Sequence, residues 1–248
     1  MKNKRLTIIE IAAAIMFLMA LGGGTALAVS PTTTDADTTP PSVTLTVVPS
    51  IGKSGDPLTV TPSASDDVSG IAEVYYNLFK AGNPNDFVCT LAHDTINGNP
   101  TDYSGLRQLP LLPFAGLAVP TGVPCPDSGI AEGTYLIVAN FEDGVGNWDG
   151  GSDPRNLASY PSNNQPAVFI YDNTPPTISA AATTSPNAAG WYNTDVIVHF
   201  TCTDNVGGSG IPSGNCPSDQ TLSNEGAAVP STAQTVTDAA GNTSALSN

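Results

Sequence analysis

Two loops with the same pattern, Asp-x-x-Gly-Asn, constrain this chain more than any other feature. The first lies in "FEDGVGN" and spans Asp143–Asn147, and the second lies in "VTDAAGN" and spans Asp238–Asn242. Each follows a strand-like run. An Asp side chain can accept hydrogen bonds from the backbone two residues further on, and Gly and Asn adopt positive φ readily. Each loop is therefore predicted to be a hairpin turn that leads into the last strand of a β-domain.

Aligning the two loops brings further segments of the chain into register. A double-proline segment, an acidic turn and the final loop follow one another in the same order in both halves. The matched pairs are 38–47 with 173–182, 65–71 with 203–211, and 132–147 with 225–242. This internal repeat sets a domain boundary near Asp172. It predicts a first domain at 39–172 and a second domain at 173–248.

Several runs alternate apolar and polar residues with a period of two. Val43, Leu45 and Val47 share one face of the run 42–48. The same holds for two other sets, Tyr135, Ile137, Ala139 and Phe141, and Val196, Val198, Phe200 and Cys202. Such alternation is typical of half-buried strands, and the 24 Gly and 22 Pro residues supply turns between them. The fold class is predicted to be all-β, with a β-sandwich as the leading architecture.

The second half resembles the bacterial immunoglobulin-like (Ig-like) repeat domains of secreted and cell-surface proteins. The resemblance rests on TPP at 174–176, GWYN at 190–193, a cysteine pair and DAAGN at 238–242, and it covers nearly all of 173–248. The first half resembles them at 38–80 and 132–150. The resemblance implies two tandem Ig-like β-sandwiches without catalytic activity, of the kind that form stalks or adhesive arms or are appended to secreted enzymes.

The two domains differ in length between the acidic turn and the final loop. Asp66 and Asp143 are 77 residues apart, whereas Asp204 and Asp238 are 34 apart. The first domain is therefore expected to carry a loop-rich insertion near 88–131. Six residues follow Asn242, barely one strand, so a truncated second domain is one expectation.

The segment 109–120, "LPLLPFAGLAVP", is the most apolar part of the insertion. Its prolines exclude a central strand. In one interpretation it folds over the sandwich and covers the core. In the other, Leu111, Leu112 and Phe114 form a partly exposed patch that binds a partner or a sugar.

The N-terminus has the layout of a secretory signal peptide over residues 1–28. Lys2, Lys4 and Arg5 precede an apolar run, and Ala26–Ala28 is a small-x-small cleavage signal. A Thr-rich linker at 29–38 is predicted to be disordered. The alternative is an uncleaved anchor at 11–29, which would make the chain a membrane-anchored sensor ectodomain. Both interpretations place the mature part outside the cytoplasm, secreted or at the cell surface.

The chain is strongly acidic, with 22 acidic and seven basic residues and a net charge of −15. This balance excludes a nucleic-acid-binding surface and argues against adhesion to anionic lipid, because both need clustered Lys and Arg. After signal cleavage, no insertion into a membrane is expected. The charge suits a soluble exported protein, or one that collects cations.

Four cysteines divide evenly between the domains, Cys89 and Cys125 in the first and Cys202 and Cys216 in the second. In an exported chain an even count favours disulfides, and pairing within each domain is the simplest of three connectivities. A zinc site is disfavoured because no Cys-x-x-Cys occurs. The two histidines, His93 and His199, also lie in different repeats.

Oxygen-bearing side chains gather near the predicted domain boundary. Asp143 and Asn147 belong to the final loop of the first domain, and Asp172 and Asn173 to the linker. Turn chemistry alone explains these residue types. The alternative is a Ca²⁺ site at the junction, which Asp66 and Asp67 of the acidic turn could join. No cofactor is otherwise required.

No motif for nucleophilic, metal-dependent or phosphate-binding catalysis occurs, so the chain is predicted not to be an enzyme and no catalytic residue is assigned. The leading hypothesis is a structural or adhesive module whose partner is a protein or glycan at the cell surface. Its rival is a carbohydrate-binding accessory domain. The candidate aromatic platforms are Trp148, Trp191, Tyr75, Tyr76 and Tyr103, with Trp191 expected to pack at a strand start.

Overall fold

The structure, a computed structural model, describes residues 37–82, 86–149 and 166–247. The described residues form strands, turns and loops, so this part of the chain is all-β, as the alternating pattern predicts. The described part contains no helix long and apolar enough to cross a membrane. The predicted signal peptide at 1–28, the alternative anchor at 11–29 and most of the linker at 29–38 lie outside the described residues.

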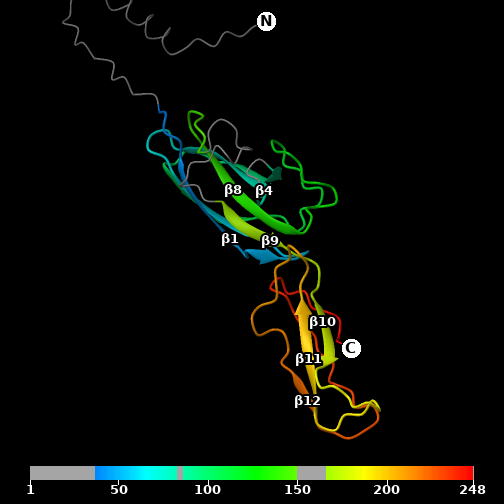
Figure 1. Cartoon of the computed structure of the whole chain (residues 1–248). Coiled ribbons are helices and arrows are strands. Elements are labelled where there is room, and N and C mark those ends of the chain that lie inside the picture. The colour runs from blue at the N-terminus through cyan, green and yellow to red at the C-terminus, as the bar shows by residue number, and fades with distance from the viewer. Residues whose placement is uncertain (1–36, 83–85, 150–165, 248) are drawn as a thin grey trace, which may run out of the picture. The chain divides into compact units, whose positions relative to one another are not determined.

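The described residues of the first repeat, 39–172, form two sheets (Figure 1). In the smaller sheet, β1 (Ser42–Val48) pairs antiparallel with β3 (Thr59–Ser65) over its full length. Strand β3 also pairs with β6 (Asp102–Ser104) and β7 (Arg107–Gln108). This sheet therefore combines segments from the start of the repeat with segments of the predicted insertion.

The larger sheet has the strand order β2-β9-β8-β4-β5. Its strands are β2 (Ile51–Gly52), β9 (Ala167–Tyr171), β8 (Gly133–Asp143), β4 (Ile71–Lys80) and β5 (Phe87–Thr95). The β2–β9 pair is parallel and the other pairs are antiparallel. Strands β8 and β4 lie side by side at the centre of this sheet (Figure 1).

The two sheets of the first repeat share one hydrophobic core. Val43 and Val60 from the smaller sheet belong to the same buried cluster as Tyr76, Ile137 and Phe141 from the larger sheet. Side chains that alternate inward from two facing sheets are the basis of a sandwich. The predicted inward face of β8 is buried throughout, from Tyr135 to Phe141.

Strand β8 is also covered on its other face, which the alternating pattern does not reveal. Val138 and Asn140 are both fully buried. Asn140 Oδ1 accepts a hydrogen bond of 2.9 Å from Nδ2 of Asn77 on the neighbouring β4. A polar pair can therefore occupy a position that would otherwise hold apolar side chains.

The predicted insertion near 88–131 contains more regular structure than loops alone. It includes most of β5 together with β6 and β7. In its apolar segment 109–120, Leu112 and Phe114 belong to the buried core, whereas Leu111 is 58% exposed. The segment thus packs on the core through two of the three residues considered for a binding patch.

The second repeat, residues 173–248, contains one three-stranded antiparallel sheet in its described part. The strand order is β10 (Thr177–Ala182), β11 (Val196–Thr203) and β12 (Gln220–Leu222) (Figure 1). On β11 the predicted inward face holds buried Val198 and Phe200. On the opposite face Ile197, His199 and Thr201 are exposed.

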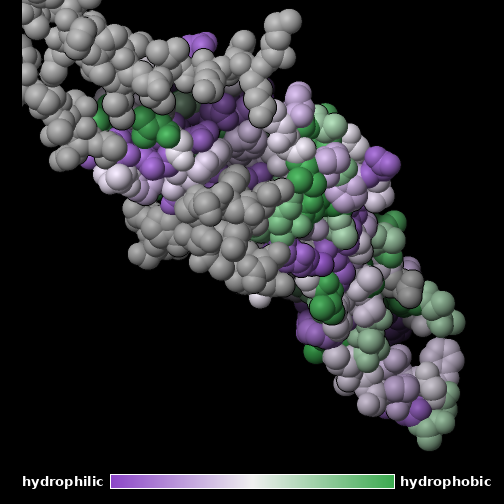
Figure 2. Space-filling model, turned by 90° about the horizontal axis from the view of Figure 1, so that it is seen from above, coloured by the Kyte–Doolittle hydropathy of each residue, from purple (hydrophilic) through white to green (hydrophobic). Residues whose placement is uncertain are grey.

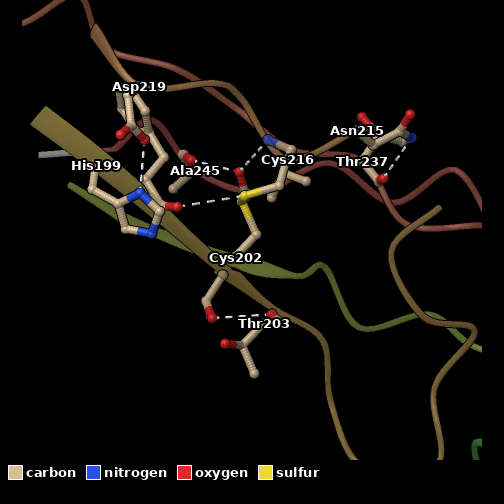
Figure 3. The surroundings of a disulfide bond; sticks show 12 residues. His199, Cys202, Thr203, Asn215, Cys216, Asp219, Thr237 and Ala245 are labelled. Carbon is tan, nitrogen blue, oxygen red and sulfur yellow. Dashed lines mark hydrogen bonds and ion pairs between the residues drawn. A yellow bond between two sulfur atoms is a disulfide. The ribbon is translucent and has the colours of Figure 1, made fainter. Parts of the chain in front are cut away.

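Each repeat contains one disulfide. Cys89 on β5 bonds to Cys125, and Cys202 on β11 bonds to Cys216 in the loop that precedes β12. Figure 3 shows the second disulfide together with the His199–Asp219 pair, in which Nδ1 lies 2.7 Å from Oδ1. Two disulfides are compatible with an exported protein in an oxidising environment.

Candidate metal centres

Two groups of three aspartates bring their carboxylates together in the described part of the chain. The first cluster consists of Asp37, Asp66 and Asp143, and the second cluster consists of Asp172, Asp204 and Asp238. In each cluster, one carboxylate oxygen from every member lies within 4.8 Å of the others.

The members of the first cluster come from three separate points of the fold. Asp37 stands in the linker before the double proline and β1. Asp66 directly follows β3, and Asp143 is the last residue of β8. Two strand ends and the linker therefore bring their carboxylates together in the first cluster.

The second cluster is built from the corresponding points of the second repeat. Asp172 directly follows β9 and precedes the double proline, Asp204 directly follows β11, and Asp238 begins the second Asp-x-x-Gly-Asn loop. The aligned segments of the internal repeat thus meet in space in both halves.

The linker aspartate is held by two backbone N–H groups in each cluster. Asp37 accepts from the N–H of Thr39 at 3.0 Å and from that of Ser69 at 3.1 Å. Asp172 accepts from the N–H of Thr174 at 3.2 Å and from that of Ser209 at 2.6 Å. One bond in each pair is local, and the other binds the linker to the acidic turn of the same cluster.

The Asp-x-x-Gly-Asn loop folds back onto its own aspartate. Asp143 Oδ1 accepts from the backbone N–H of Asn147 at 2.8 Å, and Oδ2 accepts from its side-chain Nδ2 at 2.7 Å. In the second loop Asn242 makes the same two bonds to Asp238, at 2.8 and 2.9 Å. The loop glycine has φ of +100° in the first repeat and +82° in the second, a region that favours Gly. The turn predicted from the sequence is therefore present in both repeats.

The asparagine of each loop also reaches the linker. Nδ2 of Asn147 donates to the carbonyl oxygen of Asp37 at 3.1 Å, and Nδ2 of Asn242 donates to that of Asp172 at 3.0 Å. Because Nδ2 is the contacting atom, each asparagine acts here as a donor that fixes the linker and the loop carboxylate.

The aspartate of the acidic turn uses only one of its two oxygens. Asp66 Oδ2 accepts from the N–H of Val68 at 3.2 Å and of Gly70 at 2.6 Å. Asp204 Oδ2 accepts from the N–H of Gly210 at 2.6 Å. In both residues Oδ1 is buried and has no hydrogen-bond partner.

Negative charge in these clusters is not balanced by basic side chains. Within the described ranges, no Lys or Arg forms an ion pair with any of the six aspartates. The acidic surroundings extend to Glu142. Burial raises the pKa of Glu142, and the nearby Glu73 and Asp143 raise it further. Buried carboxylates are usually paired or bound to metal, and sets of hard oxygen donors suit Ca²⁺, Mg²⁺ or Mn²⁺.

The residues proposed from the sequence as one calcium site are distributed over both clusters. Asp143 and Asn147 belong to the first cluster and its loop, and Asp172 belongs to the second. Asn173 is exposed and outside both clusters, and its Oδ1 accepts from the N–H of Ser54 at 3.2 Å. In the acidic turn Asp66 is a cluster member, whereas Asp67 is exposed.

Sequence reasoning missed Asp37, Asp204 and Asp238 as members of such a site. The signal was present in the internal repeat, which aligns these residues with Asp172, Asp66 and Asp143 respectively. Treating the aligned aspartates as two equivalent sets, one per repeat, would have identified both clusters.

A hydroxyl, an imidazole and a carboxylate also line up in the first repeat. Oγ1 of Thr121 lies 2.8 Å from Nδ1 of His93, and Nε2 of His93 lies 3.1 Å from Oε2 of Glu73. The Tyr75 ring stacks on His93 with ring centroids 4.0 Å apart, and the Trp148 ring lies 5.6 Å from Tyr75. Such an order of groups can orient an imidazole, but catalysis by it would also need donors for a developing oxyanion.

The second repeat has an open groove beside β11 with two aromatic residues on it. Trp191 is 57% exposed and Tyr192 is 41% exposed. Asn193 and Asn224 line the same groove. The expectation that Trp191 packs at a strand start is therefore wrong, because more than half of its surface is exposed to solvent. Of the other candidate platforms, Tyr76 is fully buried.

No protein-family model matches this chain, and no curated protein sequence matches it significantly.

Proposed function

We propose that this chain is an exported, non-catalytic Ig-like module that serves as a structural stalk or adhesive part of a bacterial surface or secreted protein. The observation that carries the proposal is the duplication, in two successive all-β repeats, of the bonds by which the loop asparagine holds the loop aspartate and the preceding linker. Tandem modules that repeat the same end loops suit a stalk, whose task is to extend rather than to react.

The linker between the two repeats, at Asp172 and Asn173, supports a stalk because it forms hydrogen bonds with both of them. The N–H of Asp172 donates to the carbonyl oxygen of Gly52 in the first repeat at 3.0 Å. Its carboxylate accepts from the N–H of Ser209 in the second repeat at 2.6 Å. Nζ of Lys53 also lies 2.6 Å from the carbonyl oxygen of Gly241. A linker held in this way restricts independent motion of the two modules.

The surface and the covalent structure are consistent with a place outside the cytoplasm. Both disulfides suit an oxidising compartment. On the face shown in Figure 2, hydrophobic residues among those described occur as separate groups between hydrophilic ones. The partner of such a module is a protein or a glycan at the cell surface.

Two measurements test the proposal. N-terminal sequencing of the exported chain should find Val29 as the first residue; a retained N-terminus would instead support the membrane-anchored sensor ectodomain. Backbone ¹⁵N relaxation should give one common tumbling time for both repeats. Two independent tumbling times would overturn the stalk, and insertion of a Gly-Ser segment after Asn173 provides the reference for uncoupled motion.

A carbohydrate-binding accessory domain is the second candidate, favoured by the exposed aromatic pair on the groove of the second repeat. Trp191 and Tyr192 can stack on a sugar ring, while Asn193 and Asn224 offer hydrogen bonds to hydroxyls. A glycan array with the full chain should then give hits that Trp191→Ala removes and Trp148→Ala, the matched control in the first repeat, retains. An array without hits would leave the stalk as the function.

A further inference from the structure

We propose that the chain binds two Ca²⁺ ions, one in each aspartate cluster. In the first cluster the ligands are Asp37, just before the first repeat, with Asp66 and Asp143 of that repeat. In the second cluster they are Asp172, just before the second repeat, with Asp204 and Asp238 of that repeat. The sites do not depend on which partner the module has.

The free oxygen of Asp66 points to a ligand at the first cluster. Asp66 is only 8% exposed, and its Oδ2 is engaged by the N–H groups of Val68 and Gly70. Its Oδ1 is fully buried and accepts no hydrogen bond. A buried carboxylate oxygen without a donor is strongly unfavourable unless a cation coordinates it. One carboxylate oxygen of Asp66 lies within 4.8 Å of carboxylate oxygens of Asp37 and Asp143, so a cation is the group that this cluster suits.

The second cluster repeats this arrangement independently. Asp204 Oδ1 is buried without a partner, as Asp66 Oδ1 is, and its Oδ2 accepts from Gly210 at 2.6 Å, the distance found between Asp66 and Gly70. The sequences of the two acidic turns differ in length and composition. Oδ1 nevertheless lacks a hydrogen-bond partner in both Asp66 and Asp204. The unpartnered oxygen is therefore a feature that the two clusters share.

Neighbouring hydrogen bonds leave the clusters ready for a cation without large rearrangement. Each linker and loop aspartate is already oriented by backbone or asparagine N–H groups. These donors fix the direction of the carboxylates and partly offset their mutual repulsion. A preformed set of this kind loses little conformational freedom when an ion binds.

The ligand set favours Ca²⁺ over other biological cations. Every group offered is a carboxylate oxygen, whereas zinc sites characteristically include His or Cys among their ligands. Calcium accepts 6–8 oxygens in flexible geometry and tolerates bidentate carboxylates, so three aspartates and solvent can complete its shell. Magnesium demands a near-ideal octahedron with shorter bonds, which carboxylates fixed by backbone bonds adapt to less easily.

A bound ion would join the three segments that the internal repeat defines. In each repeat it would connect the linker, the acidic turn and the final loop. In the second repeat the linker residue is Asp172, whose N–H is bonded to Gly52 of the first repeat. The second ion would therefore also strengthen the connection between the repeats.

The test uses the full chain, freed of metal with a chelator and titrated with CaCl₂ in a calorimeter, with native mass spectrometry to count bound ions. Two Ca²⁺ per chain are expected. Asp66→Asn and Asp204→Asn should each remove one ion and weaken the affected site at least 100-fold. Asparagine can retain the acceptor for Gly70 or Gly210 but places an amide N–H₂ where the free oxygen was. Asp67→Asn is the matched control, because it removes the same charge from an exposed neighbour outside the cluster.

The number of Ca²⁺ ions bound per wild-type chain tests the proposal even if a variant fails to fold. Zero ions, or a single ion per chain, would overturn the assignment of one site to each repeat. Two ions retained in both folded cluster variants would place the binding elsewhere and overturn it equally. Mg²⁺ at the same concentration should displace little Ca²⁺; equal competition would show that the sites are not calcium sites.

Discussion

The two repeats share one loop network, an aspartate cluster and a disulfide, but they differ in the size of their cores. The first repeat packs two sheets around a buried cluster that includes Tyr76, Phe141 and Phe169. The second repeat has one three-stranded sheet in its described part, and its buried apolar side chains there are Val198, Phe200 and Val236. The conserved feature between the halves is thus the polar end of the module rather than its core.

This difference indicates where each repeat obtains its stability. Burial of apolar area dominates the stability of a domain, and the second repeat has little of it. Small domains commonly compensate with disulfides or metal ions. The second repeat has the Cys202–Cys216 disulfide and an aspartate cluster. We therefore expect it to depend on these two features far more than the first repeat does.

The largest expected loss of stability comes from removing the disulfide of the second repeat. Replacing Cys202 and Cys216 together by Ser should unfold the second repeat, since the lost bond contributes about 3 kcal/mol by the chain-entropy relation. Replacing Cys89 and Cys125 costs about 4 kcal/mol by the same relation, yet the first repeat should remain folded on its larger core. Hydrogen exchange of the β11 and β8 amides checks both. Retained protection of β11 in the Cys202/Cys216 variant would show that the second core is sufficient by itself.

The next largest loss of stability is expected from substitutions in the apolar segment 109–120 of the first repeat. Leu112 is 3% exposed and belongs to the core, so Leu112→Ala should lower the stability of the first repeat by about 2–5 kcal/mol. Leu111→Ala, at a 58% exposed neighbour, should change it by less than about 0.5 kcal/mol. Differential scanning calorimetry measures both. Equal losses would mean that Leu111 also packs on the core, and no loss for either would make the segment a surface patch.

Calcium binding should raise the Tm of the second repeat more than that of the first. At a free concentration 100 times Kd, an ion that binds only the folded state stabilises it by about 2.7 kcal/mol. For a small domain this corresponds to a rise in Tm on the order of 10–20 °C, and a larger domain shifts less. The transition of the second repeat should therefore move further than that of the first. Thermal scans with CaCl₂ and with chelator test this, and equal shifts would contradict the dependence on core size.

The smallest expected effect concerns the surface of the second sheet. His199 and Asp219 form a pair with 2.7 Å between Nδ1 and Oδ1, but both side chains are about half exposed. Exposed ion pairs contribute little, so Asp219→Asn should change the free energy of unfolding by less than about 0.5 kcal/mol in urea titrations. A loss above 1 kcal/mol would give this contact, between β11 and the loop before β12, a share of the stability that we assign to the neighbouring disulfide.

Much of the local structure follows from residue order alone. Alternation in 42–48 and 134–143 predicts strands with Val43 and Phe141 inside, because the side-chain period of a strand is fixed at two. The Asp-x-x-Gly-Asn pattern predicts its turn, since Gly supplies positive φ and Asp accepts the loop N–H groups. The strands β4 and β5 were not predicted. The buried positions of β4 lie on both of its faces, and β5 falls inside the range expected to be an insertion.

The chain by itself determined the all-β class, the internal repeat, the two turns and the residue types that hold them. Those properties are set by contacts between residues close in sequence and by backbone sterics. Only the tertiary structure decided that Asp37, Asp66 and Asp143 meet, although 29 and 77 residues separate them along the chain. It also decided that Leu112 is buried while Leu111 is exposed. Pairing of β1 with β3 and of β4 with β8 brings distant strand ends to one place, and sequence spacing does not specify which ends will meet.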